Sequence, residues 1–184
     1  MTQTRSLIAA LAATTALAAP AMAQDDTLTV GVLLTLSGPG AVLGEMARDG
    51  FLLAAEEIGD LGGIPTEIIV VDDEQKPDVA ANKARELVER NGADIVVGPI
   101  FSNVAGAIVQ PVTQGGGILI SPNAGPSNLA GAECNKAFFA TSYQNDQMHE
   151  VMGAHAQAQG FQNVFLLAPN YQAGQDALAA VSYT

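Results

Sequence analysis

Residues 27–36 read TLTVGVLLTL, a run of β-branched and aliphatic residues in which polar and apolar side chains do not alternate. A strand of this kind is typical of a parallel sheet covered by helices on both faces. Gly and Pro residues within Ser37–Gly40 end the strand. A helical spacing of apolar residues then begins at Glu45 and ends at Gly62 and Gly63. The start of this region therefore predicts one βα unit.

The alternation of strand and helix continues up to Thr141. Further helices are expected to begin at Pro77 and at Ser102, the second of them running to about Gln114. In the helix that begins at Pro77, the spacing predicts that four residues face inward: Ala80, Ala84, Leu87 and Val88. Four more strands are predicted, over Glu67–Val71, Ile95–Gly98, Ile118–Ile120 and Ala137–Ala140. The pattern predicts an α/β fold with a parallel sheet flanked by helices.

After Thr141 the pattern starts again. A helix is expected over Gln144–Gln159, a strand over Asn163–Leu167 and a further helix over Ala173–Val181. Since one strand cannot form a sheet, this segment is interpreted as the opening βα unit of an incomplete second domain.

The first 23 residues have the features of a secretory signal peptide. Arg5 supplies a positive charge, Leu7–Ala19 is a short apolar run, and Ala21-Met22-Ala23 is a small-x-small cleavage pattern. Cleavage is predicted after Ala23, with export most simply to a bacterial periplasm. The single cysteine, Cys134, can form no disulfide within the chain.

Composition narrows the classes of function. Seven Lys and Arg residues face nineteen Asp and Glu residues, for a net charge of −12, and the basic residues are scattered singly. Binding to nucleic acid or to an anionic membrane needs a clustered basic face, so neither partner is expected. No nucleotide-binding glycine motif, nucleophile motif or metal-ligand spacing is present, so we expect no cofactor, no metal and no catalysis.

Ligands of parallel sheets bind beyond the carboxyl ends of the strands, where four loops are expected: Ser37–Gly44, Asp72–Pro77, Ile100–Asn103 and Ser121–Asn128. Ser102 and Asn103 either cap a helix or lie where its N–H groups bind a carboxylate. Ser121–Gly125 is either an ordinary turn or a close approach to a ligand. Tyr143 and Tyr171 either stack on a ligand or lie half-buried at a domain boundary. Asp72-Asp73-Glu74 is interpreted as a solvated acidic turn rather than a cation site.

Short motifs along the whole mature chain, in this order and spacing, carry a resemblance: LSGP at 36–39, ARDGF at 47–51, GGI at 62–64, DD at 72–73, VGP at 97–99, GILISP at 117–122, TSYQNDQ at 141–147 and NYQAG at 170–174. The chain resembles the type I periplasmic substrate-binding proteins of ABC transporters, in the Leu/Ile/Val-binding group. The last two motifs resemble the branch that binds aromatic acids such as benzoate derivatives.

The resemblance implies two α/β lobes that close on a ligand. Residues 24–141 would form a complete lobe one, and residues 142–184 would begin lobe two. The implied function is the extracytoplasmic solute-binding component of an ABC importer, a monomer that delivers a small carboxylate to a membrane permease and its ATPase. The alternatives are a ligand-sensing domain of the same fold, or a truncated fragment without function.

The resemblance also implies a set of ligand-binding residues. Phe101 and Ser102 match the loop that holds the ligand carboxylate, and Tyr171 matches a tyrosine that covers the ligand. Asn123, Ala124 and Gly125 match a second loop of lobe one, although amino-acid binders usually have threonine where Gly125 stands. An aromatic acid, with its ring next to Tyr143 and Tyr171 and its carboxylate on Ser102, is consistent with that difference.

Overall fold

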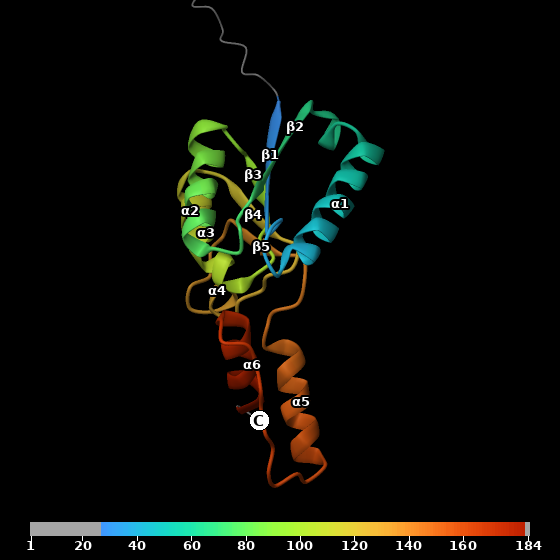
Figure 1. Cartoon of the computed structure of the whole chain (residues 1–184), viewed down its shortest axis with the longest axis vertical. Coiled ribbons are helices and arrows are strands. Elements are labelled where there is room, and N and C mark those ends of the chain that lie inside the picture. The colour runs from blue at the N-terminus through green and yellow to red at the C-terminus, as the bar shows by residue number, and fades with distance from the viewer. Residues whose placement is uncertain (1–26, 183–184) are drawn as a thin grey trace, which may run out of the picture.

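A computed structural model describes residues 27–182, so the predicted signal peptide and its cleavage site lie outside the described residues. Five strands form one parallel sheet in the order β2-β1-β3-β4-β5 (Figure 1). Their bounds are β1 Leu28–Leu34, β2 Thr66–Asp72, β3 Ile95–Val97, β4 Ile118–Ser121 and β5 Phe138–Ala140. The predicted α/β class and parallel sheet are confirmed.

The strand order reverses at β1, which pairs in parallel with β2 on one side and with β3 on the other. Val30 is aligned with Ile68 in β2 and with Ile95 in β3. The loops that follow β1 and β3 therefore leave the same edge of the sheet in opposite directions. In doubly wound sheets, this reversal point opens a crevice for ligands.

Helices cover both faces of the sheet. One core layer contains Leu33, Val96 and Leu119 packed with side chains of α2 (Pro77–Arg85), the π-helical turn η2 (Glu86–Arg90) and α3 (Ser102–Gln114). The predicted inward-facing set of the second helix is confirmed, since Ala80, Ala84, Leu87 and Val88 are all buried there. A smaller layer on the other face places Val30, Val32 and Leu34 against α1 (Ala41–Ile58) and the 3-10 turn η1 (Leu61–Gly63).

Helix α1 begins four residues before the predicted Glu45 and packs over only part of its length. Ala47 and Phe51 contact the core as predicted, whereas Ala54 and Ile58 are exposed. Figure 1 shows α1 leaning away from β1 toward its C-terminal end, in agreement with the exposure of Ala54 and Ile58 there. The apolar spacing identified the helix but not where its contact with the sheet stops.

The C-terminal segment consists of two packed helices, α5 (Gln147–Ala158) and α6 (Gln172–Ser182), beyond the carboxyl ends of the strands (Figure 1). The predicted strand Asn163–Leu167 is wrong, because these residues form no strand. A strand needs a hydrogen-bonded neighbour, and the five-stranded sheet ends at β5 without pairing to this segment. Phe165 and Leu167 are consequently 89% and 88% exposed.

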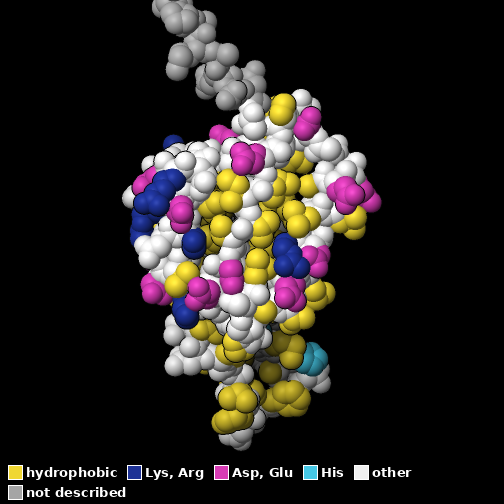
Figure 2. Space-filling model, turned by 45° about the horizontal axis from the view of Figure 1, so that its top comes forward, with side chains coloured by type: hydrophobic (Ala, Val, Ile, Leu, Met, Phe, Trp, Pro, Cys, Tyr) yellow, Lys and Arg dark blue, Asp and Glu magenta, His cyan; other side chains and the backbone are white. Residues whose placement is uncertain are grey.

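Hydrophobic side chains are visible on both parts of the surface. Figure 2 shows them in the centre of the sheet domain (residues 27–140), with acidic and basic side chains around them, and again at the lower end, where the C-terminal segment lies. None of the helices within residues 27–182 combines the length and apolar character that a membrane span requires. The short helix α4 (Ser127–Ala130) completes the elements and follows β4.

Candidate ligand-binding cleft

A cleft of about 660 Å³ lies at the reversal point of the sheet. One wall belongs to the sheet domain and the other to the segment that leads into α6. The lining residues are Pro39, Glu74, Gln75, Phe101, Asn103, Pro169, Asn170 and Tyr171. The first five come from the loops that follow β1, β2 and β3 and from the first turn of α3, as expected for a ligand site of a doubly wound sheet.

Two aromatic rings form the contact across this cleft. Phe101 precedes α3, Tyr171 precedes α6, and their ring centroids are 6.1 Å apart with the planes inclined by 69°. Edge-to-face pairs at this separation are attractive, so the two rings contact each other directly. A Cβ at Gly40 would lie 2.6 Å from the Phe101 ring, so glycine is needed for Phe101 to adopt this position.

The N-terminus of α3 supplies donors next to the aromatic pair. Phe101 is the N-cap residue, and within the described residues no side chain caps the helix. The first turn of a helix leaves backbone N–H groups without intrahelical acceptors, and these groups together with the helix dipole favour a carboxylate. Asn103, in this turn, lines the cleft. The cleft thus combines an aromatic wall with an anion-binding end.

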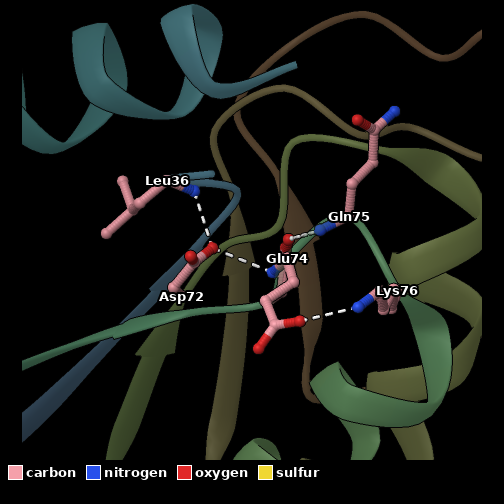
Figure 3. Close-up of polar contacts among 6 residues, drawn as sticks. Leu36, Asp72, Glu74, Gln75 and Lys76 are labelled. Carbon is pink, nitrogen blue, oxygen red and sulfur yellow. Dashed lines mark hydrogen bonds and ion pairs between the residues drawn. The ribbon is translucent and has the colours of Figure 1, made fainter. Parts of the chain in front are cut away.

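The third part of the cleft wall is a strained corner between β2 and α2 (Figure 3). Glu74 and Gln75 have φ values of 53° and 58°, in a region that L residues seldom occupy. Two carboxylates hold the corner: Asp72 Oδ1 accepts from Glu74 N at 2.8 Å, and Asp73 Oδ1 accepts from Gln75 N at 2.7 Å. Gln75 Oε1 in turn accepts from Gly40 N at 3.2 Å. The side chain of Gln75 is therefore fixed at the cleft.

The neighbouring aspartates of this corner have opposite electrostatic surroundings. Burial alone would raise the pKa of Asp72, but hydrogen bonds from the Ser37 hydroxyl and from the N–H groups of Leu36, Glu74 and Ser37 outweigh it and lower the pKa. Burial raises the pKa of Asp73, and hydrogen bonds from Thr35 and Gln75 offset this only in part. Asp73 is fully buried, and its Oδ2 has no hydrogen-bond partner among the described residues.

The interpretation of Asp72-Asp73-Glu74 as a solvated acidic turn is therefore wrong for Asp73, which is a buried anchor of the turn. Thr35 Oγ1 donates to Asp73 Oδ1 at 2.7 Å, and Asp73 N donates to Leu34 O. Glu74 is exposed and pairs with Lys76 Nζ at 2.8 Å, which raises the pKa of that lysine. Within residues 27–182, no three His, Cys, Asp or Glu side chains are grouped to hold a metal.

The remaining sequence-predicted residues lie behind the cleft rather than along it. Ser102 is buried, and its hydroxyl exchanges hydrogen bonds with the side chain of Asn145 instead of capping α3. The Asn123 side chain donates to Ile100 O at 2.8 Å and ties two loops together. Ala124 is buried in the larger core layer. Of the seven predicted ligand residues, the structure brings Phe101 and Tyr171 to the cleft wall.

Gly125 packs against the segment that leaves the sheet domain. A Cβ at this position would overlap the backbone carbonyl of Tyr143, and Gly125 O accepts from Asn145 N at 2.8 Å. The close approach of the Tyr143 backbone leaves no room for a side chain at Gly125, and this explains why threonine is absent there. Tyr143 itself is 70% exposed and does not line the cleft.

Several cleft residues were not singled out from the sequence. Pro39 and Gln75 lie in two of the four loops expected at the ligand edge, but nothing in their residue type distinguishes them from their neighbours. Their importance depends on which side chain each turn presents. Pro169 and Asn170 come from the segment whose predicted strand does not form.

The fold and cleft define a class: doubly wound α/β domains that bind a small ligand at the strand reversal point, against a wall from a second segment. The sequence profile of the periplasmic binding proteins matches residues 27–184. The chain belongs to the periplasmic binding protein family.

Individual relatives agree with this assignment. The Leu/Ile/Val-binding protein BraC3 of Rhizobium johnstonii is 31% identical over 150 residues, which are 80% of this chain and 40% of that protein. A solute-binding protein of an ABC transporter from R. palustris, solved in complex with benzoate, is 32% identical with a TM-score of 0.78, over 85% of this chain and 44% of that one.

A third relative binds an amino acid. The branched-chain amino acid transporter substrate-binding protein LivJ from Streptococcus pneumoniae, solved with isoleucine, has a TM-score of 0.65 and 28% identity, over 71% of this chain and 38% of that one. The chain therefore spans less than half the length of each of these relatives. The ligands named for these relatives belong to two chemical classes, and both carry a carboxylate.

Proposed function

We propose that this chain is part of the extracytoplasmic solute-binding component of an ABC importer, which binds a small carboxylate between two lobes and delivers it to a membrane permease and its ATPase. The chain would contribute lobe one, residues 24–141, and the beginning of lobe two, residues 142–184. The role is binding and not catalysis, and the mature protein would be a periplasmic monomer released by cleavage after Ala23.

The observation that carries this proposal is the cleft in which Phe101 and Tyr171 face each other beside the N-terminus of α3. Uncapped N–H groups and the helix dipole favour the carboxylate of a ligand. The two rings favour an apolar or aromatic body attached to that carboxylate. The walls come from segments far apart in sequence, so a ligand between them would join the two lobes.

Among carboxylates, an aromatic acid fits this half of the cleft better than a branched-chain amino acid. The sides of the aromatic pair that face the cleft offer a surface on which a third ring can pack. The relative in complex with benzoate, at 32% identity, supports the same choice. Isoleucine remains the second candidate because LivJ and BraC3 belong to the branched-chain group.

A thermal-shift panel on protein containing this chain tests the proposal. Benzoate, 4-hydroxybenzoate, isoleucine, leucine and valine would each be added at increasing concentration, since a ligand that binds only the folded state raises Tm as its concentration rises. Stabilisation by the benzoates is expected. Stabilisation by the amino acids alone would show that the ligand is a branched-chain amino acid and not an aromatic acid. If none of the five compounds stabilises the protein, the solute-binding role is contradicted.

A further inference from the structure

A buried carboxylate lies where the sheet domain, the connecting segment (residues 141–146, between β5 and α5) and α6 meet. Asp176, on α6, is 9% exposed. Its Oδ2 accepts from Ser127 N at 3.1 Å and from Asn145 Nδ2 at 2.7 Å, and its Oδ1 accepts from Gln172 Nε2 at 2.8 Å. All three donors are uncharged. A buried carboxylate with several hydrogen bonds holds its donors firmly, because each bond is charge-assisted and water is excluded.

Asn145 carries this link into the sheet domain. Its Nδ2 lies 3.0 Å from Ser102 Oγ, in addition to the bond to Asp176, and its backbone N–H donates to Gly125 O at 2.8 Å. The side chains of Ser102, Asn145 and Asp176 thus form one continuous path from α3 through the connecting segment to α6. Ser127, at the start of α4, ties the carboxylate to the sheet domain a second time.

Both aromatic walls of the cleft adjoin this path. Phe101 immediately precedes Ser102, and Tyr171 immediately precedes Gln172, the first residue of α6. The bond from Gln172 to Asp176 joins residues four apart, so it fixes the first turn of that helix. We propose that Asp176 is a positioning residue of the cleft, which acts through Asn145 and Gln172 to hold Tyr171 opposite Phe101. Its effect on ligand affinity rests on the proposed solute-binding function, whereas its effect on the geometry does not.

Hydrogen exchange of the whole chain tests the geometric part. In Asp176→Asn, an amide replaces one oxygen, so at least one of the three donors loses its acceptor while the shape of the side chain is kept. Exchange of the Ser127 amide, which donates to Asp176 Oδ2, is expected to become about tenfold faster, because its acceptor loses its charge or is replaced by an amide nitrogen. The Asn145 amide keeps its acceptor, Gly125 O, and is expected to become about threefold faster, because the Asn145 side chain loses its anchor on Asp176. Amides of β1 should be unchanged, and they report whether the sheet domain stays folded.

A matched control removes the same charge elsewhere. Asp49→Asn changes an exposed carboxylate on α1 that forms an ion pair with its neighbour Arg48. Exchange at Ser127 and Asn145 should match the unmodified chain. Equal acceleration in Asp49→Asn, or acceleration in β1 as large as at Asn145, would overturn the proposal, because the effect would then be one of net charge or general stability.

A swapped pair distinguishes positioning from a simple loss of packing. Asn145→Asp alone brings two carboxylates together and is expected to speed exchange as Asp176→Asn does. The double variant, Asn145→Asp with Asp176→Asn, restores the contact between positions 145 and 176 with donor and acceptor reversed, and should return exchange of the amide at position 145 to within about twofold of the unmodified chain. The Ser127 amide should stay fast in the double variant, because the atom that accepted its hydrogen bond is then an amide nitrogen. Failure of the swap to restore protection would count against the proposal.

Gln172→Ala provides a second route if Asp176→Asn does not fold. It leaves the carboxylate in place and removes one donor on the first turn of α6. The Gln175 amide, which donates to Tyr171 O, should then exchange about threefold faster, as for the loss of one ordinary hydrogen bond. An unchanged rate there would overturn the link from Asp176 to Tyr171.

Ligand binding is measured separately with benzoate and isoleucine as probes. Asp176→Asn is expected to weaken binding about tenfold, mainly through faster dissociation, because the walls are less well preorganised. If the unmodified chain binds neither probe, the proposed function fails while the exchange experiment still decides the positioning role. If benzoate binds equally to both and exchange is unchanged, only the positioning role fails.

Discussion

The ring of Phe101 meets the ring of Tyr171 edge to face, at a centroid separation of 6.1 Å, although the two residues are 70 positions apart in the chain. Phe101 is held at the start of α3 by the sheet, and Tyr171 is held at the start of α6 by the network around Asp176. The pair therefore reports directly on how the sheet domain and the C-terminal segment are held together.

Removing the far ring should weaken the binding of an aromatic acid. Tyr171→Ala is expected to raise the Kd for benzoate about tenfold, since an aromatic contact and its buried area are lost. Isothermal titration calorimetry measures this change. Tyr143→Ala serves as the matched control because Tyr143 is 70% exposed and outside the cleft, so its effect should stay within about twofold. A larger effect at Tyr143 than at Tyr171 would move the site to the connecting segment.

Gln75 should contribute to affinity through its side-chain amide. Oε1 is occupied by Gly40 N, so Nε2 is the atom left to donate to a ligand oxygen. Gln75→Leu is expected to weaken benzoate binding about fivefold, the effect of one uncharged donor. Gln114→Leu, at an exposed glutamine of α3 whose side chain donates to Gln110 Oε1, is the control and should not alter the Kd. Equal Kd values for Gln75→Leu and the unmodified chain would remove Gln75 from the site.

Two glycines should respond to the same substitution with opposite signs. Gly125→Ala places a methyl group against the carbonyl of Tyr143 and should lower the free energy of unfolding by about 1–3 kcal/mol through overpacking. Gly106→Ala, in α3, meets no atom within 4 Å and should raise it by about 0.5–1 kcal/mol through helix propensity. Urea denaturation followed by circular dichroism measures both. A stabilising Gly125→Ala would contradict the close packing of the connecting segment.

The two aspartates of the cleft corner should give opposite pH dependences. The pKa of Asp73 is raised above 3.8 on folding, so its contribution to stability is largest below that pH and is lost as pH rises through the folded-state pKa. Asp73→Asn should therefore gain stability, relative to the unmodified chain, as pH rises toward neutrality.

Asp72 provides the comparison. Its pKa is lowered on folding, so it stabilises the fold above pH 3.8, and that contribution is lost as pH falls through the folded-state pKa. Asp72→Asn should lose stability at neutral pH, and the deficit should shrink on acidification. Urea denaturation of both variants between about pH 3 and about pH 7 measures the two trends. This range begins below the ordinary pKa of a carboxyl group and ends well above it. Trends of the same sign would contradict the opposite environments of the two carboxylates.

Much of the sheet could be predicted because its signals are local. The apolar run at Thr27–Leu36, the breaks at glycine and proline, and the helical spacing of Ala80, Ala84 and Leu87 each follow from short-range geometry. The span of α3, Ser102–Gln114, is predicted correctly for the same reason. The family resemblance stated from the motifs is confirmed by the match over residues 27–184.

The site was less predictable because it depends on contacts between distant residues. Nothing local indicates that the Ser102 hydroxyl turns to Asn145, or that Asp73 is buried while Glu74 is exposed. The apolar pattern at Asn163–Leu167 predicted a strand, yet a strand forms only where a neighbour supplies hydrogen bonds. Tertiary pairing, and not propensity, decided each of these cases.

Titration of benzoate into the isotopically labelled chain, followed by amide NMR, tests the central claim most directly. The account predicts saturable shifts at Phe101, Ser102, Asn103 and Tyr171, which report the helix N-terminus and the facing ring together. Isoleucine should produce smaller shifts at the same amides. Absence of saturable shifts with both compounds, or shifts confined to residues outside the cleft, would contradict a carboxylate site beside the Phe101–Tyr171 pair.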